Sequence, residues 1–178
     1  MRIVSKGGKG SISGGSVNTG AISGSDIVIN LVGILSGDFE AFHHQGAAHV
    51  AQAAAAANVR ALVHVSAIGA DAESPSAYGR SKASGEAAVK EAFPGATIIR
   101  PSIIFGPDGG ILNLFADLIA SLPVLPVFAP DSPLQVVHVD DVAAAITKAL
   151  LNPSEFGGKI YELAGPDRWT MMELNQRI

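Results

Sequence analysis

Ser66, Tyr78 and Lys82 are the residues of this sequence whose types and spacing could support acid–base chemistry. Ser66 follows residues 62–65 (Leu-Val-His-Val), a short apolar run that is typical of a buried strand. Residues 77–93 are rich in Ala, Lys and Glu and end before a Pro-Gly pair, which predicts a helix. Because a spacing of four residues places two side chains on one helix face, Tyr78 and Lys82 lie one turn apart.

A tyrosine next to a lysine can exchange a proton near neutral pH. The pKa of a free tyrosine is about 10. A lysine ammonium about 4 Å away, at an effective dielectric of about 20, favours the phenolate by up to about 4 kcal/mol. We therefore expect Lys82 to lower the pKa of Tyr78 toward about 7, while Ser66 holds a carbonyl or hydroxyl oxygen. The alternative is that Tyr78 and Lys82 are an exposed pair on a helix surface.

Composition limits the class of protein. The 178 residues are enough for one domain, and 48% hydrophobic with 16% charged residues can supply a core. No run approaches the ~20 apolar residues of a membrane span, and a net charge of −4 with dispersed Lys and Arg gives no basic patch. The absence of cysteine excludes disulfides and thiolate chemistry. We expect neither a nucleic-acid partner nor a membrane span.

The order of apolar runs predicts strands that alternate with helices. The predicted strands are 26–32, 62–66, 96–100, 135–139 and 159–164, and the predicted helices are 39–58, 77–93, 111–122, 140–151 and one that begins after Thr170. This alternation indicates an α/β fold with a Rossmann-like, doubly wound parallel sheet. Ligands bind such sheets at the carboxyl ends of strands, where Asn30 to Gly33, Ser66 and Pro101 are expected.

Residues 1–24 are rich in glycine and serine. Gly7 to Gly14 invites a phosphate-loop interpretation, because glycines let backbone N–H groups approach a pyrophosphate. A clean Gly-x-Gly-x-x-Gly pattern is absent, however, and no amphipathic helix follows directly. We therefore predict a flexible or remnant segment. The alternative is that Arg2 to Ser5 and the glycines form a degenerate first strand and loop.

Three histidines, His43, His44 and His49, lie along the predicted helix 39–58. No cysteines or carboxylates join them at ligand spacing, so we expect no metal site and interpret them as solvated or satisfied within the core.

Several motifs together resemble the extended or atypical short-chain dehydrogenases/reductases of the NAD-dependent epimerase/dehydratase type. The motifs are Asn30-Leu31-Val32-Gly33, Val65-Ser66-Ala67, Tyr78-x-x-x-Lys82, Arg100-Pro101-x-x-x-Phe105-Gly106-Pro107 and Val139-x-Asp141-Val142. Within that family, the residues around Asn30, Ser66 and Pro101 are most similar to the branch that contains the nucleotide-binding accessory subunit of respiratory complex I and its bacterial relatives.

The resemblance implies catalytic positions and a dinucleotide site. Ser66, Tyr78 and Lys82 would take the catalytic positions. The residues that would contact NADP or NAD are Asn30, Val32, Gly33, Val65, Tyr78, Lys82, Pro101, Ser102, Ile103 and Ile104. The resemblance favours NADPH, held as a structural element by an accessory or assembly factor of complex I, with complex I subunits as partners. The alternatives are an active NAD(P)-dependent oxidoreductase or nucleotide-sugar epimerase, and a non-functional fragment.

The resemblance also implies a location and an incomplete fold. We expect a cytoplasmic protein, or a peripheral one at the bacterial inner membrane or on the mitochondrial matrix side. Such proteins begin with a strand, a glycine-rich loop, a helix and a second strand, which precede the region matched here. Residues 25–178 would then be a partial NAD(P)-binding domain, with small substrate-side elements from about residue 101. Without the first helix N-terminus, dinucleotide binding would be weak, and strand 26–32 would have an unpaired edge.

Overall fold

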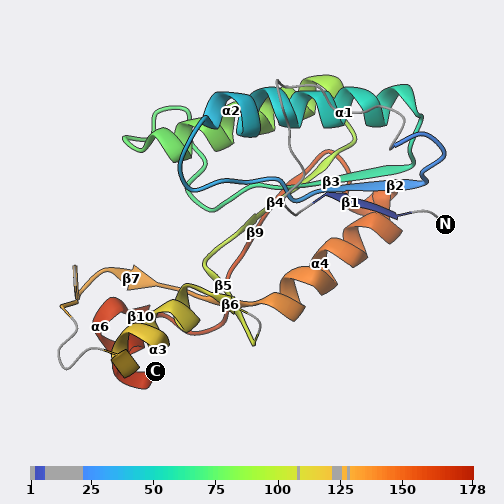
Figure 1. Ribbon diagram of the computed structural model, residues 1–178. Helices are drawn as coiled ribbons and strands as arrows, with labels where there is room; N and C mark the ends of the chain where they lie inside the picture. The colour runs from blue at the N-terminus through green and yellow to red at the C-terminus, as the bar shows by residue number, and fades with distance from the viewer. Residues whose placement is uncertain (1–2, 7–21, 108, 122–125, 128) are drawn as a thin grey trace. The chain divides into compact units, whose positions relative to one another are not determined.

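The computed structural model describes residues 3–6, 22–107, 109–121, 126–127 and 129–178 (Figure 1). The chain divides into two compact units. The first unit comprises Met1–Arg100 and Ile146–Glu162, and the second comprises Pro101–Ala145 and Leu163–Ile178.

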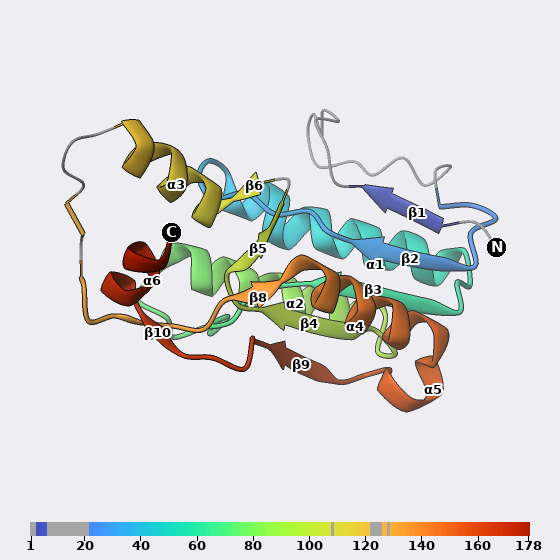
Figure 2. The same cartoon turned by 90° about the horizontal axis from the view of Figure 1, so that it is seen from below.

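A five-stranded sheet forms the centre of the first unit. Its strands are β1 (Ile3–Lys6), β2 (Ile27–Asn30), β3 (Ala61–Val65), β4 (Thr97–Pro101) and β9 (Ile160–Leu163), in the order β1-β2-β3-β4-β9 (Figure 2). The first four pair in parallel. β9 also runs parallel to β4, because the amides of Ile98 and Ser102 donate to carbonyls that follow in the same order along the β9 side. The predicted α/β class with a parallel sheet is confirmed.

The predicted unpaired edge of the strand after Asp26 is wrong. β1 pairs with β2 in parallel register from Ile3 opposite Ile27 to Lys6 opposite Asn30. This pairing satisfies the ladder groups that would otherwise be open. A first strand is thus present, one residue later than in the alternative interpretation of Arg2 to Ser5. The glycines of the suggested phosphate loop, Gly7 to Gly14, lie outside the described residues.

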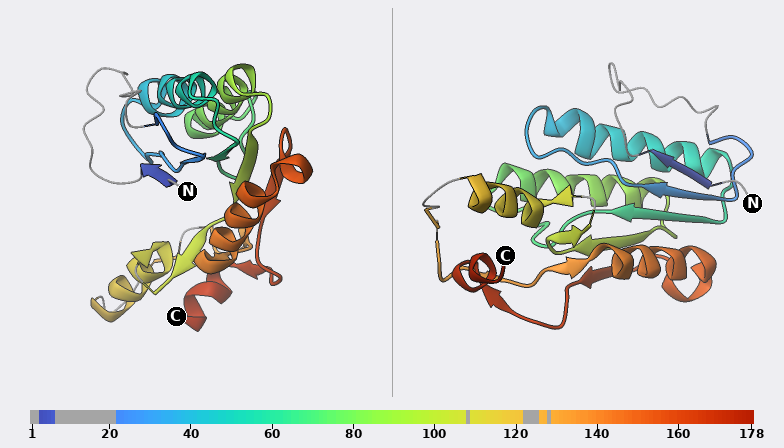
Figure 3. Two further views of the ribbon diagram at one scale, coloured as in Figure 1. Left: turned by 90° about the vertical axis from the view of Figure 1, so that its right-hand side faces the viewer. Right: turned by 60° about the horizontal axis from the view of Figure 1, so that its bottom comes forward.

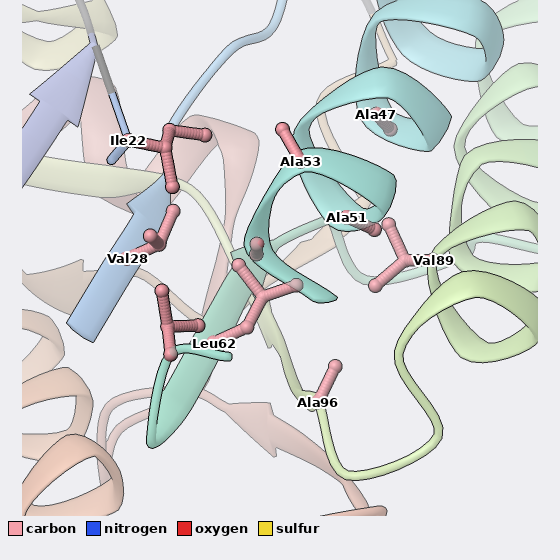
Figure 4. Close-up of a cluster of buried hydrophobic side chains, with 10 residues drawn as sticks. Ile22, Val28, Ala47, Ala51, Ala53, Leu62, Val89 and Ala96 are labelled. Atoms are coloured by element: carbon pink, nitrogen blue, oxygen red, sulfur yellow. The ribbon is translucent and has the colours of Figure 1, made fainter. Parts of the chain in front are cut away.

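Two helical segments pack together on one face of the sheet. The first is η2 (Glu40–Gln45), a π-helical turn that continues into α1 (Gly46–Ala56), and the second is α2 (Ala77–Ala92). Figure 3 shows α1 and α2 side by side over the strands. Figure 4 shows the core between these helices and the sheet, where the alanines of α1 let the helix approach the strands closely. The cluster contains Ile22, Val28, Ala47, Ala51, Ala53, Ala54, Val59, Leu62, Val89 and Ala96.

The opposite face of the sheet is buried as well. Thr97 pairs with Val63, whose side chain points away from that of its neighbour Leu62 in the core cluster. The Thr97 hydroxyl donates to the carbonyl of Phe156, the last residue of the short helix α5 (Pro153–Phe156). Burial on both faces explains why these strands read as continuous apolar runs.

The second unit consists of short elements. β5 (Ile104–Gly106) pairs with β6 (Gly109–Gly110) and with β8 (Val137–His138), and β7 (Pro133–Leu134) pairs with β10 (Trp169–Thr170). Its helices are α3 (Ile111–Ser121), the first part of α4 (Val139–Leu151) and α6 (Met171–Arg177). α6 begins with a capping box in which Thr170 and Glu173 bind each other's backbone amides, as the Thr-x-x-Glu spacing indicates.

Candidate functional site

The carboxyl ends of β2 and β3 lie side by side at one edge of the sheet, because the two strands are parallel neighbours. Asn30, the last residue of β2, places its Nδ2 3.1 Å from Nδ1 of His64 on β3. The Oδ1 of Asn30 accepts the amide of Val32 at 3.1 Å. Asn30 and His64 are both buried. The Asn30 amide therefore fixes the first residues of the segment that leaves β2.

Lys82 is buried beside the end of β3, with 3% of its surface exposed. Its Nζ donates to the carbonyl of Val65 at 3.1 Å. Burial lowers the pKa of Lys82 to about 8, opposed by the nearby carboxylate of Glu86. Because Val65 precedes Ser66, this hydrogen bond brings the ammonium next to the predicted serine.

Tyr78 lies one helical turn before Lys82, at the start of α2. Burial raises its pKa above the ordinary value of 10. The expected lowering of the Tyr78 pKa by Lys82 is therefore wrong. Desolvation of the phenol dominates, and the Lys82 ammonium is hydrogen-bonded to the Val65 carbonyl.

Ser66 has only 5% of its surface exposed, and its Oγ has no hydrogen-bond partner in the described part of the chain. Its backbone amide donates to the carbonyl of Ile99 at 2.7 Å, which fixes the residue at the carboxyl end of β3. A buried hydroxyl without a partner is costly and needs an explanation. The Ser66 hydroxyl is therefore a buried polar group that no hydrogen bond within the described residues satisfies.

Among the three predicted catalytic residues, contact is indirect. Lys82 is hydrogen-bonded to the carbonyl of Val65, the residue before Ser66, and Tyr78 lies on the same helix as Lys82. Among the described residues, no hydrogen bond joins the three side chains to one another.

His43 is part of this region, although its role was not identified from the sequence. It is 2% exposed, and its Nε2 accepts the amide of Ile34 at 3.0 Å. Its Nδ1 lies 2.8 Å from the hydroxyl of Ser81 on α2. Its ring is stacked on Phe39 and lies edge-on to Tyr78, with centroids 5.2 and 5.5 Å away. The spacing of His43 from Ala47, Ala51 and Ala54 puts it on the same helix face as these alanines. Because that face is buried, the spacing could have indicated from the sequence that His43 is buried.

Gly33 is the point where the segment after β2 passes His43 and Lys82. A Cβ added at Gly33 would lie 3.9 Å from both His43 Nε2 and Lys82 Nζ, which is ordinary contact distance. Of the other predicted cofactor residues, Pro101 ends β4, and Ser102, Ile103 and Ile104 belong to the second unit. Within that unit, the Ser102 amide donates to the Leu163 carbonyl.

Among the described residues, no three His, Asp or Glu side chains are grouped so that they could hold a metal ion. None of the described helices has the length and apolar character needed to cross a membrane.

Solved structures of other proteins share this fold. UDP-glucuronic acid 4-epimerase from Bacillus cereus, in complex with NAD, matches with a TM-score of 0.77 at 16% identity, covering 91% of this chain and 62% of the epimerase. dTDP-4-dehydrorhamnose reductase from Bacillus anthracis, in complex with NADP, matches with a TM-score of 0.72 at 21% identity, covering 85% and 60%. The fold is that of the short-chain dehydrogenases/reductases of the epimerase/dehydratase type, as the motifs indicated.

The family follows from the sequence. Residues 39–178 match the family model described as RmlD substrate binding domain, and the chain belongs to this family.

Curated relatives are similar over most of the chain. Mitochondrial NADH dehydrogenase (ubiquinone) 1 alpha subcomplex subunit 9 of Dictyostelium discoideum is 35% identical over 165 residues, covering 89% of this chain and 45% of the relative. The protein of the same name from Arabidopsis thaliana is 38% identical over 155 residues, covering 84% and 39%. Ceramide reductase of Caulobacter vibrioides is 38% identical over 135 residues, covering 73% and 42%. The chain thus spans less than half the length of each of these relatives.

Proposed function

We propose that this chain forms the nicotinamide side of a dinucleotide site in an accessory or assembly protein of respiratory complex I. NADPH would serve there as a bound structural element. The observation that carries this proposal is the hydrogen bond from Lys82 to Val65 beside the unpartnered hydroxyl of Ser66. It attaches a buried ammonium to the residue that precedes a buried, unpartnered hydroxyl, and both groups are of a type that binds oxygen atoms of a polar ligand.

The protonation of the site allows both side chains to hold a ligand. The phenol of Tyr78 has a raised pKa, so it is neutral at pH 7. The pKa of Lys82 is about 8, so the ammonium is largely charged. A neutral phenol and an ammonium both act as hydrogen-bond donors. Complex I subunits among the relatives support the accessory role.

The residues of the first unit proposed to contact the dinucleotide are those named from the motifs: Asn30, Val32, Gly33, Val65, Tyr78 and Lys82. The dinucleotide would supply hydride chemistry if a substrate were also bound. We propose NADPH over NADH from the resemblance alone. The proposed location is peripheral, with complex I subunits as partners at the inner membrane or on the matrix side.

Calorimetric titration of NADPH and NADH into the chain tests this proposal. We expect measurable but weak NADPH binding that Lys82→Met removes, because the variant keeps the buried methylenes and loses the ammonium. Lys90→Met is the matched control, since Lys90 is an exposed lysine on the same helix. Equal affinities for the two variants, or no binding by the unaltered chain, would contradict the proposal.

The second candidate function is an active NAD(P)-dependent oxidoreductase or nucleotide-sugar epimerase. The presence of Ser66, Tyr78 and Lys82 together favours it, since a purely structural protein has no chemical need for this set. A relative named ceramide reductase points the same way.

Tyr78→Phe distinguishes the two functions. For an enzyme, NADPH oxidation or epimerase turnover would fall about 100-fold or more with little change in binding. For an accessory protein, the unaltered chain would show no turnover and would co-purify with complex I subunits.

A further inference from the structure

We propose that His43 is a positioning residue of the candidate site: as a neutral imidazole with its proton on Nδ1, it ties the segment after β2 to the turn of α2 that carries Tyr78. The inference concerns the same site as the proposed function and rests on it for its biological meaning. Its geometry can be tested separately.

The hydrogen bonds of His43 assign its proton. The amide of Ile34 points at Nε2 from 3.0 Å, and because an amide can only donate, Nε2 must accept. A neutral imidazole then carries its hydrogen on Nδ1. Nδ1 lies 2.8 Å from the Ser81 hydroxyl, which in turn donates to the carbonyl of Tyr78 at 2.8 Å. Between the Ile34 amide and the Tyr78 carbonyl, His43 and Ser81 each accept one hydrogen bond and donate one, so the network is complete only with this tautomer.

The surroundings of His43 keep it uncharged. Burial, followed by repulsion from the Lys82 ammonium, lowers the pKa of His43 to about 4. The other ionisable groups that face it or Lys82 across η2, β3 and α2 are His64, Tyr78 and Glu86. Protonation of Nε2 would place a second donor against the Ile34 amide. The neutral form is therefore the one that holds the segment.

The backbone of His43 is fixed by α2. A Cβ at Gly85 would overlap the carbonyl oxygen of His43, so only glycine permits this approach. The His43 ring lies between Phe39 and Tyr78, stacked on the first and edge-on to the second. The backbone contact and the ring packing together set where Nε2 meets the Ile34 amide and where the Tyr78 ring lies.

His64 provides an internal contrast. The Asn30 Oδ1 accepts the Val32 amide, which leaves the Asn30 Nδ2 to donate to Nδ1 of His64. His64 therefore carries its proton on Nε2, opposite to His43. Two buried histidines of one site are thus expected in different tautomers.

The first test is nitrogen-15 NMR of the histidine side chains at pH 7, with His43→Gln and His64→Gln used for assignment. We expect a protonated Nδ1 for His43 and a protonated Nε2 for His64. A protonated Nε2 on His43, or a His43 that titrates with the pKa of a free histidine, would overturn the inference, whether or not the chain binds a dinucleotide.

The second test measures position. His43→Leu removes both hydrogen bonds, whereas His43→Gln can keep an acceptor for the Ile34 amide. We expect His43→Leu to shift the Ile34 amide and Tyr78 ring signals and to weaken NADPH binding about five- to tenfold, with His43→Gln closer to the unaltered chain. Ser81→Ala, which removes only the hydroxyl, should shift the Tyr78 signals with the fold retained. The half-buried neighbour His44, which contacts Glu40 and neither Ile34 nor Ser81, is the control when changed to Leu. Equal effects of the His43 and His44 variants on these signals would overturn the inference.

Discussion

Glu86 and Arg100 join helix α2 to strand β4 through two hydrogen bonds of 2.8 Å each, one to each carboxylate oxygen. The Glu86 side chain is 5% exposed and that of Arg100 is 20% exposed. Arg100 also reaches Glu162 on β9 at 3.3 Å, but that carboxylate is 55% exposed. The buried pair lies one helical turn beyond Lys82, and its carboxylate opposes the loss of the lysine's charge.

Glu86→Gln should destabilise the chain by about 3 kcal/mol, because removal of one partner leaves a mostly buried guanidinium without its counter-charge. Urea unfolding followed by circular dichroism measures this change. Glu162→Gln removes only the exposed partner of Arg100 and should cost about 0–1 kcal/mol. Similar losses of unfolding free energy in the two variants would show that the doubly hydrogen-bonded pair of Arg100 and Glu86 stabilises the chain no more than the exposed contact with Glu162.

Lys82→Met should raise the pKa of His43 above its value of about 4, because the second cause of the lowering is the Lys82 charge. The pKa should remain below the ordinary 6.5, since burial, the larger cause, persists. An NMR titration of the His43 ring would measure the shift. Lys90→Met, from the same helix, should leave it unchanged. An unaltered pKa in Lys82→Met would place the ammonium farther from His43 than the structure does.

The sequence predicted the sheet and the position of α2 well, because both depend on local patterns. Buried parallel strands read as apolar runs, and residues 77–93 contain helix formers bounded by a stop signal. The same patterns placed Ser66 at the end of a strand and Lys82 on the helix that follows. These predictions need only the periodicity of apolar residues along the sequence and the order of the predicted strands.

Other features depend on contacts that no local pattern encodes. The direction of the Tyr78 pKa was missed because the sequence shows the Tyr-Lys spacing but neither the depth of burial nor the Val65 carbonyl that engages the ammonium. The pairing of β1 with β2 was missed because four residues before a glycine-rich stretch carry little periodic signal. The sequence analysis allowed for a His43 satisfied within the core but could not name its partners, because Ile34 and Ser81 lie on other segments of the chain.

Gly85→Ala should destabilise the chain although alanine is the better helix former. The gain in helix propensity is about 1 kcal/mol. The added methyl group would overlap the His43 carbonyl, and overpacking costs about 1–3 kcal/mol. The overlapping groups belong to the backbones of η2 and α2, which can move apart only by disturbing both helical segments. The cost of overpacking should therefore exceed the gain in helix propensity. Thermal unfolding would show a lower melting temperature for Gly85→Ala, whereas Ser84→Ala on the same helix should not lower it. A more stable Gly85→Ala would mean that η2 and α2 are not in close contact.

Acid should destabilise the chain through its buried histidines. The folded-state pKa of His43 is about 4 and that of His64 about 3, both below the ordinary 6.5, chiefly because of burial. Below 6.5 the unfolded chain binds protons that the folded chain does not, so the free energy of unfolding falls as the pH drops toward these values. Urea unfolding between pH 7 and about pH 4 should show this slope, and His43→Gln should reduce it. His44→Gln is the control at a half-buried position on the same segment. A slope unchanged by His43→Gln would contradict the burial of a neutral imidazole.

Ser66→Ala should separate stability from binding. The Ser66 hydroxyl has no partner among the described residues, so its removal loses no hydrogen bond within the folded chain and relieves the cost of a buried polar group. We expect the free energy of unfolding to stay equal or to rise by up to about 1 kcal/mol. If Ser66 binds a ligand oxygen, NADPH affinity should fall about two- to tenfold. Thr97→Val is the opposite case, because the buried Thr97 hydroxyl donates to the Phe156 carbonyl on the other face of the sheet. That variant should cost about 1 kcal/mol and leave the affinity unchanged. A loss of stability in Ser66→Ala as large as that in Thr97→Val would mean that the Ser66 hydroxyl is satisfied within the protein, and its assignment to a ligand would fail.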